Sequence, residues 1–576
     1  MHGHGNSVIK TLLLVTICLV IAMAIRVVEA QAGVTHPTPI SLLELFGIII
    51  VLLIAGLTFL GYNAFGLTEP LLIGNIIGLI LGIPQVALPL SAMLELVYLG
   101  VFPVGGAAAP NAVVATITSL MFAKILGYTT VTSVELGTLM AIAIPIGMLA
   151  MYLEVVGARA GCVIYSHWAD REIEKGNIGR LGIIAFLGSL QWFVVYMIPI
   201  LAIAALGMSQ AAVETIRVSL ENPALQKILS ALGVGAALMP AVGLGLLLKL
   251  TYGPGMLPWF ILGYVLAAYL KLPILGITLL IISLILAIHW RELYEALQAP
   301  STMSSTPQSS SSQVFTKSDF IKTYLKITFA DQWAWNYERM QGTAYAFVMN
   351  HVERKLRKDP EELKSWMRLH NEFFNTQPLM TAMIVGVNMA VEEGGADQET
   401  VRSLKTSLMG PLAGLGDGLF WFTWRPIAFG IGAGLTLTAG ALGPIVAFIL
   451  WCPLVMTLGW YLLKLGYRYG FNMVSVIKGG RIEIIRRIAS MIAVAIIAAL
   501  GVSYIAVSVP VKIAVPEAQP INIQAAIDMI MPRLIPLIFL LGSFYMYRKG
   551  LSITKVLAIY FLIGVVLGLL GILSAG

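Results

Sequence analysis

Three short clusters of aromatic, amide and charged residues stand out in an otherwise apolar chain. They read WNYERMQ from Trp335, HNEFFNTQP from His370 and MGPLAGLGDGLFWFTWRP from Met409. In the third cluster, aromatic rings beside a few hydrogen-bonding groups suit the face and hydroxyls of a sugar, but an interfacial aromatic belt with an anchoring arginine would have the same composition. Its glycines do not form a nucleotide loop, because the GxxxxGK[ST] pattern is missing.

A single acid, Glu95, lies inside the apolar segment PLSAMLELVYLG. An ionised side chain near the centre of a bilayer costs about 2.5–3.5 kcal/mol, so it is retained where it faces a polar interior. Snorkelling to an interface or a packing role is the alternative. The following residues, 103–113, are rich in Gly, Ala and Pro, which indicates either interrupted backbone that lines a cavity or close contact between helices.

The elements that must position these groups are membrane-spanning helices. Of 576 residues, 58% are hydrophobic and 11% charged, and the mean hydropathy is +0.88. About 20 apolar residues cross a bilayer as a helix, and alternating barrel strands would be less continuously apolar. The sequence therefore predicts an all-α, polytopic membrane protein. Its clearest predicted spans are Ser41–Gly61, Leu181–Leu206, Ala441–Leu463 and Ile488–Val507.

The net charge of +7 does not indicate nucleic-acid binding. Lys and Arg fall mostly between apolar runs, where they act as orientation signals. Cys18, Cys162 and Cys452 lie in or beside apolar segments and lack the paired spacing of a metal site or redox pair. We therefore expect no nucleic-acid partner, no metal and no cofactor.

The chain divides into two membrane halves. Residues 1–30 are either a signal peptide or an extra N-terminal helix, residues 41–297 form the first membrane domain, and the Ser- and Pro-rich stretch 298–318 is a linker. Residues 319–405 are amphipathic and rich in Lys and Arg, which places them in the cytoplasm. Residues 406–576 form the second membrane part.

The three clusters, in this order and spacing, resemble the IID component of the mannose-family sugar phosphotransferase systems over most of residues 319–576. The motifs are WNYERMQG, EFFNTQP and SLMGPLAGLGDGLFW. The first half is similar to the IIC component of the same systems over residues 41–297. Its motifs are PLLIGNIIGLILG, MLELVYLGVFPVGGAAAPNAV and HWADREIEKGN. The sequence thus resembles a fusion of two components that are usually separate chains.

The resemblance implies two related halves, each with a moving core and a scaffold, and a homotrimer in the cell membrane. It also implies which side chains lie near the sugar and which shape the core or its gate. The implied substrate-binding residues are Glu95, Asn63, Trp335, Asn336, Tyr337 and Glu338. The implied core and gate residues are Asn111, Asn375, Asp417 and Arg425.

The sequence departs from the family pattern at four positions, which puts the identity of the substrate in doubt. Asn63 and Gly66 stand where an acid and a glutamine are common, Asn111 replaces the usual Asp, and Gln377 replaces the usual His.

The function implied is a permease that binds and translocates a hexose or amino sugar. Transfer of a phosphoryl group needs a phosphorylated His or Cys, and the polar regions here are too short to form such a carrier domain. No catalytic residue is therefore expected in this chain, and separate IIA and IIB proteins would phosphorylate the sugar. A facilitator that needs no phosphate and a receptor that transports nothing are the alternative functions.

Overall fold

The computed structural model describes residues 39–59, 62–101, 109–220, 222–298, 314–470, 481–513 and 521–575. Residues 1–30, and with them the choice between a signal peptide and an extra helix, lie outside this range, as does most of the linker. The all-helical membrane fold predicted from the sequence is confirmed, because the strands cover two residues each.

In the first half, twelve α-helices are described, together with a π-helix (η2) and a short 3-10 helix (η3). They are α2 Leu42–Phe59, α3 Pro70–Ile80, α4 Pro84–Tyr98, α5 Ala112–Ile125, α6 Ser133–Leu153, η2 Glu154–Ala160, α7 Val163–Glu174, η3 Ile178–Arg180, α8 Leu181–Met208, α9 Gln210–Leu220, α10 Pro223–Ala237, α11 Met239–Thr251, α12 Leu257–Ala268 and α13 Ile274–Gln298.

The second half follows the linker and adds a second π-helix, η4. Its helices are α14 Lys317–Ala330, α15 Gly342–Leu356, α16 Pro360–His370, α17 Pro378–Glu393, α18 Gln398–Gly416, η4 Asp417–Trp424, α19 Arg425–Ala439, α20 Leu442–Tyr469, α22 Arg481–Tyr504, α23 Ile523–Ile530, α24 Leu534–Arg548 and α25 Ile553–Leu569. Two antiparallel pairs join β1 Val507–Ser508 to β4 Ser574–Ala575 and β2 Lys512–Ile513 to β3 Ile521–Asn522.

Six of the described helical stretches are long and apolar enough to cross a membrane, or seven if α23 and α24, bent by 71°, form one broken span. The predicted spans fall on α2, α8, α20 and α22. Glu95 instead lies on a short helix, α4, which follows another short helix, α3. Each begins with a proline at its first position, where the missing N–H costs nothing.

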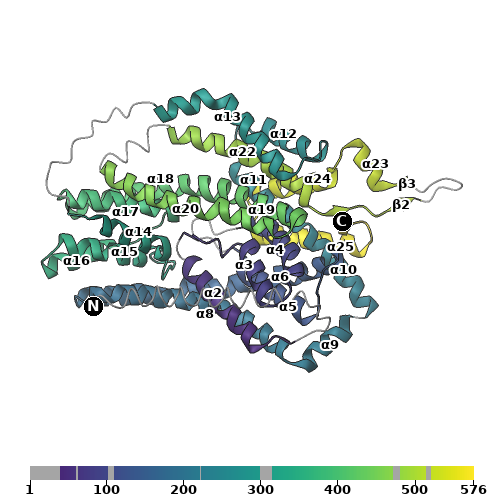
Figure 1. Ribbon diagram of the computed structural model, residues 1–576, viewed down its shortest axis with the longest axis horizontal. Coiled ribbons are helices and arrows are strands. Elements are labelled where there is room, and N and C mark those ends of the chain that lie inside the picture. The colour runs from purple at the N-terminus through teal and green to yellow at the C-terminus, as the bar shows by residue number, and fades with distance from the viewer. Residues whose placement is uncertain are drawn as a thin grey trace.

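The two halves pack against one another along their length. Helices α10 to α13 of the first half contact α22, α24 and α25 of the second, and α4 contacts α19. Helices α14 to α17 lie at one end of the molecule, and β2, β3 and α23 lie at the other (Figure 1).

Candidate functional site

A cavity with polar groups in its walls lies at the junction of the two halves, and residues from both line it. Its volume is about 180 Å³. The first half contributes Asn63, Thr68, Glu69, Val101, Ala109, Pro110, Asn111, Ala112, Val113, Glu154, Arg159, Trp192 and Tyr196. The second half contributes Gln332, Trp335, Asn375, Thr376, Gln377, Pro378, Ala413, Asp417, Trp421 and Arg425.

One wall of the cavity is organised around the buried carboxylate of Glu154. Its Oε2 accepts hydrogen bonds from Asn111 Nδ2 (3.0 Å) and from the Tyr196 hydroxyl (2.8 Å), and its Oε1 accepts from Arg159 Nε (2.8 Å). Asn111 is itself fixed, because it caps α5 by accepting from the Val114 N–H. A buried charge is tolerated when it is paired and hydrogen-bonded in this way.

The Arg159 guanidinium joins this polar wall to an aromatic corner. It lies over the rings of Trp192 and Trp335, at 5.7 and 5.3 Å from the ring centres. The two indoles meet edge to face at 6.2 Å. Glu154 and Arg159 both lie on η2, and π-helical turns are frequently found at functional sites.

A second part of the lining contains a buried ion pair that joins the two halves. Arg425 donates from Nε and Nη2 to the two carboxylate oxygens of Glu69, at 2.8 and 2.6 Å, and from Nη1 to the Leu99 carbonyl oxygen. Asn63 Nδ2 donates to Glu69 Oε1 at 3.1 Å, and the Asn63 carbonyl accepts from Trp451 Nε1. Asn63 has φ of 49°, in the left-handed region that asparagine tolerates better than most residues.

The third side of the cavity comes from the connection between α16 and α17. Gln377 caps α17 by accepting from the Met380 N–H, and Pro378 follows at the first helical position. Gln341 holds Thr376 from both sides, because it accepts from the Thr376 N–H (2.9 Å) and donates to the Thr376 carbonyl (2.9 Å). These bonds present Asn375 and Gln377 to the cavity.

The structure brings six of the ten sequence-predicted residues together at this cavity. They are Asn63, Asn111, Trp335, Asn375, Asp417 and Arg425. The other four, Glu95, Asn336, Tyr337 and Glu338, do not line it. Glu95 is fully buried, accepts from the Leu71 N–H at 3.0 Å and interacts electrostatically with Glu69, so it lies behind the ion pair.

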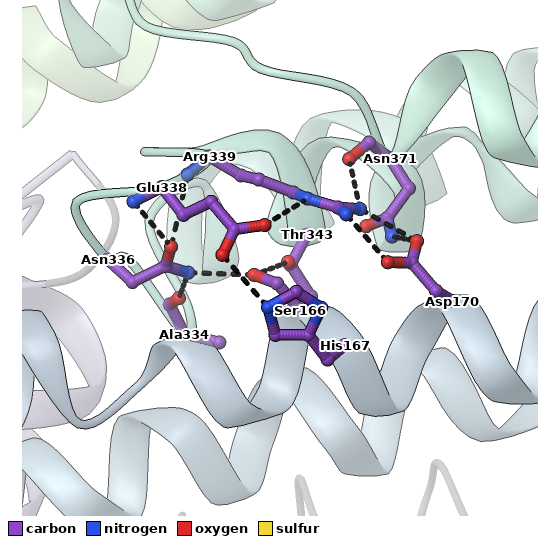
Figure 2. A network of polar contacts seen from close by, with 9 residues as sticks. All are labelled: Ser166, His167, Asp170, Ala334, Asn336, Glu338, Arg339, Thr343 and Asn371. Atoms are coloured by element: carbon purple, nitrogen blue, oxygen red, sulfur yellow. Dashed lines mark hydrogen bonds and ion pairs between the residues drawn. The ribbon is translucent and has the colours of Figure 1, made fainter.

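Asn336 and Glu338 instead belong to a polar seam between α7 and the 334–343 segment (Figure 2). Asn336 Nδ2 donates to the Ser166 hydroxyl at 2.8 Å, and His167 Nε2 lies 2.9 Å from Glu338 Oε2. The neighbouring Tyr337 donates its backbone N–H to the Arg159 carbonyl oxygen. This turn therefore attaches one half to the other and presents only the Trp335 ring to the cavity.

The strongest contact of the seam is between Arg339 and Asp170. Arg339 donates from both terminal nitrogens to the two oxygens of Asp170, at 2.7 and 2.6 Å, and Asn371 Nδ2 donates to the same carboxylate (Figure 2). Bidentate arginine–carboxylate pairs fix geometry as well as supply energy. The motifs HWAD and WNYER, which lie far apart in sequence, are thus the two sides of one contact.

The seam depends on a glycine, and its substitution gives a first prediction. A Cβ on Gly188 would lie 2.6 Å from the Cα of Ala334. We expect Gly188→Ala to lower the free energy of unfolding by about 1–3 kcal/mol, because backbone atoms cannot yield to it. Thermal unfolding in detergent measures this. Gly410→Ala is the control, since open space surrounds Gly410. Equal melting temperatures for Gly188→Ala and wild type would contradict the expectation.

Sequence reasoning missed Glu69, Glu154 and Arg159. The signal for the last two was present, because two charges inside the apolar run MLAMYLEVVGARAGCV are costly unless they face a polar interior. Among the lining residues there is no histidine and no cysteine. The carboxylates, amides and indoles that are present can bind hydroxyl groups and a ring.

Comparisons with known proteins match both halves. The family described as "PTS system mannose/fructose/sorbose family IID component" matches residues 314–573, and the family described as "PTS system sorbose-specific iic component" matches residues 42–289, where PTS is the sugar phosphotransferase system.

Individual relatives agree with these two assignments. The PTS system mannose-specific EIID component of Escherichia coli O6:H1 is 32% identical over 286 residues, covering 47% of this chain and 100% of the relative. The PTS system sorbose-specific EIID component of Lacticaseibacillus casei is 34% identical, covering 45% and 95%. The sorbose-specific EIIC component of the same organism is 30% identical, covering 36% and 71%.

Proposed function

Because this chain belongs to the mannose/fructose/sorbose family of phosphotransferase membrane components, with a IIC and a IID component in one polypeptide, we propose that it binds a hexose or amino sugar between its halves and moves it across the membrane. A separate IIB protein, phosphorylated by IIA, then phosphorylates the sugar at the cytoplasmic face. The chain works in this proposal as a homotrimer.

The observation that carries the proposal is the cavity that both components share. Its 180 Å³ would hold about a dozen water molecules at roughly 15 Å³ each, which is the size of a monosaccharide. Its lining combines the indoles of Trp335 and Trp192 with carboxylates and amides. An indole face packs against a sugar ring, and the acids and amides accept and donate hydrogen bonds at its hydroxyls.

The proposed roles follow from the contacts. Trp335, Asn375 and Asp417 lie at the cavity and would contact the sugar, together with Glu154 and Glu69. The buried Glu95 would support the Glu69 wall, and Asn336, Tyr337 and Glu338 would hold the Trp335 ring in place through the seam (Figure 2).

Two of the departures from the family pattern have local partners. Asn63 and Asn111 each donate an amide N–H to an acid of the cavity wall, Glu69 and Glu154 respectively. An aspartate at either position would place two carboxylates in contact, which costs free energy in a buried site. The departures are therefore compatible with a polar sugar cavity in this chain.

Substrate and coupling are tested together by uptake into vesicles. Labelled mannose, sorbose, fructose and an amino sugar are offered with and without phosphorylated IIB. We expect accumulation as sugar phosphate only when IIB is supplied. Equal uptake of free sugar without IIB would favour the facilitator, and binding without uptake under all conditions would favour a receptor.

Trp335→Ala gives the prediction for the site itself. We expect sugar affinity to fall about tenfold, because one face of the ring loses its packing partner, and about 1.4 kcal/mol corresponds to that factor. Trp290→Ala is the matched control, since its side chain is 59% exposed and does not line the cavity. Isothermal titration with the transported sugar measures both. Equal losses in the two variants would place the sugar elsewhere.

A further inference from the structure

A second cluster of ionisable groups lies in the charged bundle of the second half, apart from the sugar cavity. It consists of Glu353, His370 and Glu392, which we call the triad, from the C-terminal ends of α15, α16 and α17. The exposed fractions of these residues are 0%, 0% and 1%. Two carboxylates and an imidazole are thus enclosed together in the protein interior.

The spacing of the triad matches the coordination shell of one ion. His370 Nε2 lies 3.0 Å from Glu353 Oε1 and 3.5 Å from Glu392 Oε1, and the three potential ligand atoms lie within 4.8 Å of one another. Ligands at about 2.0–2.2 Å from a tetrahedral metal are separated by roughly 3.3–3.6 Å. One ion could therefore contact all three side chains after small shifts.

The hydrogen bonding of the triad points to a missing ligand. Both carboxylate oxygens of Glu392 and the Oε2 of Glu353 are fully buried and have no hydrogen-bond partner among the described residues. Buried polar atoms are nearly always hydrogen-bonded, and buried charges are paired or bind metals. A cation at the centre of the triad would satisfy these oxygens.

The neighbouring side chains of Arg357 and Lys405 do not supply a cation at the centre of the triad. Arg357 Nε lies 3.5 Å from Glu353 Oε2, and its guanidinium lies over the Trp366 ring. Lys405 Nζ donates to the Leu369 carbonyl oxygen and faces the ring of Tyr345. Among the residues that the structure describes, Glu392 is therefore left without a bonded cation other than His370.

We propose that Glu353, His370 and Glu392 bind one divalent transition-metal ion, such as Zn²⁺, Mn²⁺ or Fe²⁺. One imidazole nitrogen and two carboxylates suit these ions, whereas sites for Mg²⁺ and Ca²⁺ are built from oxygen ligands. The sequence predicted no metal, because its cysteines lacked metal-site spacing and the triad is assembled only when three helices pack.

The occupant that competes with a metal is a proton. Burial alone would lower the pKa of His370, but the carboxylates of Glu392 and Glu353 outweigh it and raise the pKa to about 9. A protonated imidazole would place one positive charge among two carboxylates. Burial and the Glu353 carboxylate also raise the pKa of Glu392, so a proton on Glu392 that is shared with Glu353 competes with the ion as well.

The ion would have a structural effect on the neighbouring segment. His370 and Glu392 flank the connection and helix that carry Asn375 and Gln377 to the cavity. A metal that fixes the ends of α15, α16 and α17 would hold this connection in place. The inference does not rest on the proposed function, because metal content is measured without any sugar.

The test is the metal content of the full chain, purified in nanodiscs from cells supplied with zinc, manganese and iron. By elemental mass spectrometry we expect about one ion per chain in wild type and at least about tenfold less in Glu392→Gln. Glu393→Gln is the matched control, since the adjacent Glu393 accepts from the Tyr467 hydroxyl and the Val314 N–H instead. It should retain the ion.

A second measurement needs no variant. Wild-type protein stripped with a chelator should gain thermal stability when Zn²⁺ or Mn²⁺ is added, because an ion that binds only the folded state stabilises it. X-ray absorption of the reloaded protein should show nitrogen and oxygen ligands and no sulfur. Wild type that holds no stoichiometric ion and gains no stability would overturn the proposal in favour of protons on His370 and Glu392 only. Full metal content in Glu392→Gln would also overturn it.

Discussion

Arg425→Met is expected to abolish sugar uptake and to lower the free energy of unfolding by about 3–5 kcal/mol. The substitution leaves the Glu69 carboxylate, whose side chain is 3% exposed, without its bidentate partner. It also frees the Leu99 carbonyl oxygen. Because Glu69 and Arg425 belong to different halves, the loss falls on the contact between the halves as well as on the cavity wall.

A double variant separates stability from transport. Glu69→Gln with Arg425→Met removes both charges, and replacing a whole buried pair by neutral groups is often nearly neutral for stability. We expect the double variant to recover about 1–3 kcal/mol relative to the sum of the single variants, but not to recover uptake, because the cavity has lost its charged wall. Chemical unfolding in detergent and vesicle uptake give the two readouts.

An exposed pair between the same halves provides the control for this cycle. Arg368 donates to both oxygens of Glu174, with side chains that are 50% and 56% exposed. Surface pairs contribute about 0–1 kcal/mol, so Arg368→Met should change stability little and leave uptake intact. If Arg425→Met behaved like Arg368→Met, the buried pair would not hold the halves together.

The class of the fold was accessible from the sequence, because a hydrocarbon core allows little besides helices and closed barrels. The long apolar runs appeared as α8, α20 and α22, of which α8 keeps its predicted ends most closely. Helix α20 continues past the predicted end at Leu463 to Tyr469, and α22 begins at Arg481 before the predicted Ile488. The short helices α3 and α4 were less evident, since their apolar run is interrupted by Gly82 and Pro84. Where such helices turn depends on their neighbours and not on hydropathy alone.

The candidate site was only partly predictable. Asn63 and Asn111 were found as departures from a family pattern, but their partners, Glu69 and Glu154, were not. Periodicity cannot show that η2 turns Glu154 and Arg159 toward a cavity. Asn336 and Glu338 of the WNYER motif were interpreted as sugar ligands, whereas their partners lie on α7, about 170 residues away in sequence. Such pairing is a property of tertiary packing.

Glu154→Gln is expected to weaken sugar binding by about 100-fold, or 2–3 kcal/mol, which is the value of a hydrogen bond to a charged group. The Gln side chain has nearly the size of Glu154, but its NH₂ group donates hydrogen bonds and cannot accept them. One carboxylate oxygen of Glu154 accepts from Asn111 and Tyr196, and the other accepts from Arg159. In either orientation, the NH₂ group would therefore face a donor. Arg159 then loses its charge partner beside the Trp335 ring. Sugar titration followed by tryptophan fluorescence measures the affinity and reports on the ring at once.

Tyr196→Phe provides the graded comparison, because it removes a single neutral donor and keeps the carboxylate with its Arg159 and Asn111 contacts. A hydrogen bond of this kind contributes about 0.5–1.5 kcal/mol, so affinity should fall by roughly two- to tenfold. If Glu154 only stabilised the fold, both variants would lower the melting temperature and leave the affinity of the folded protein unchanged. If both variants are expressed like wild type and Glu154→Gln loses more sugar affinity than Tyr196→Phe, Glu154 belongs to the wall that contacts the sugar.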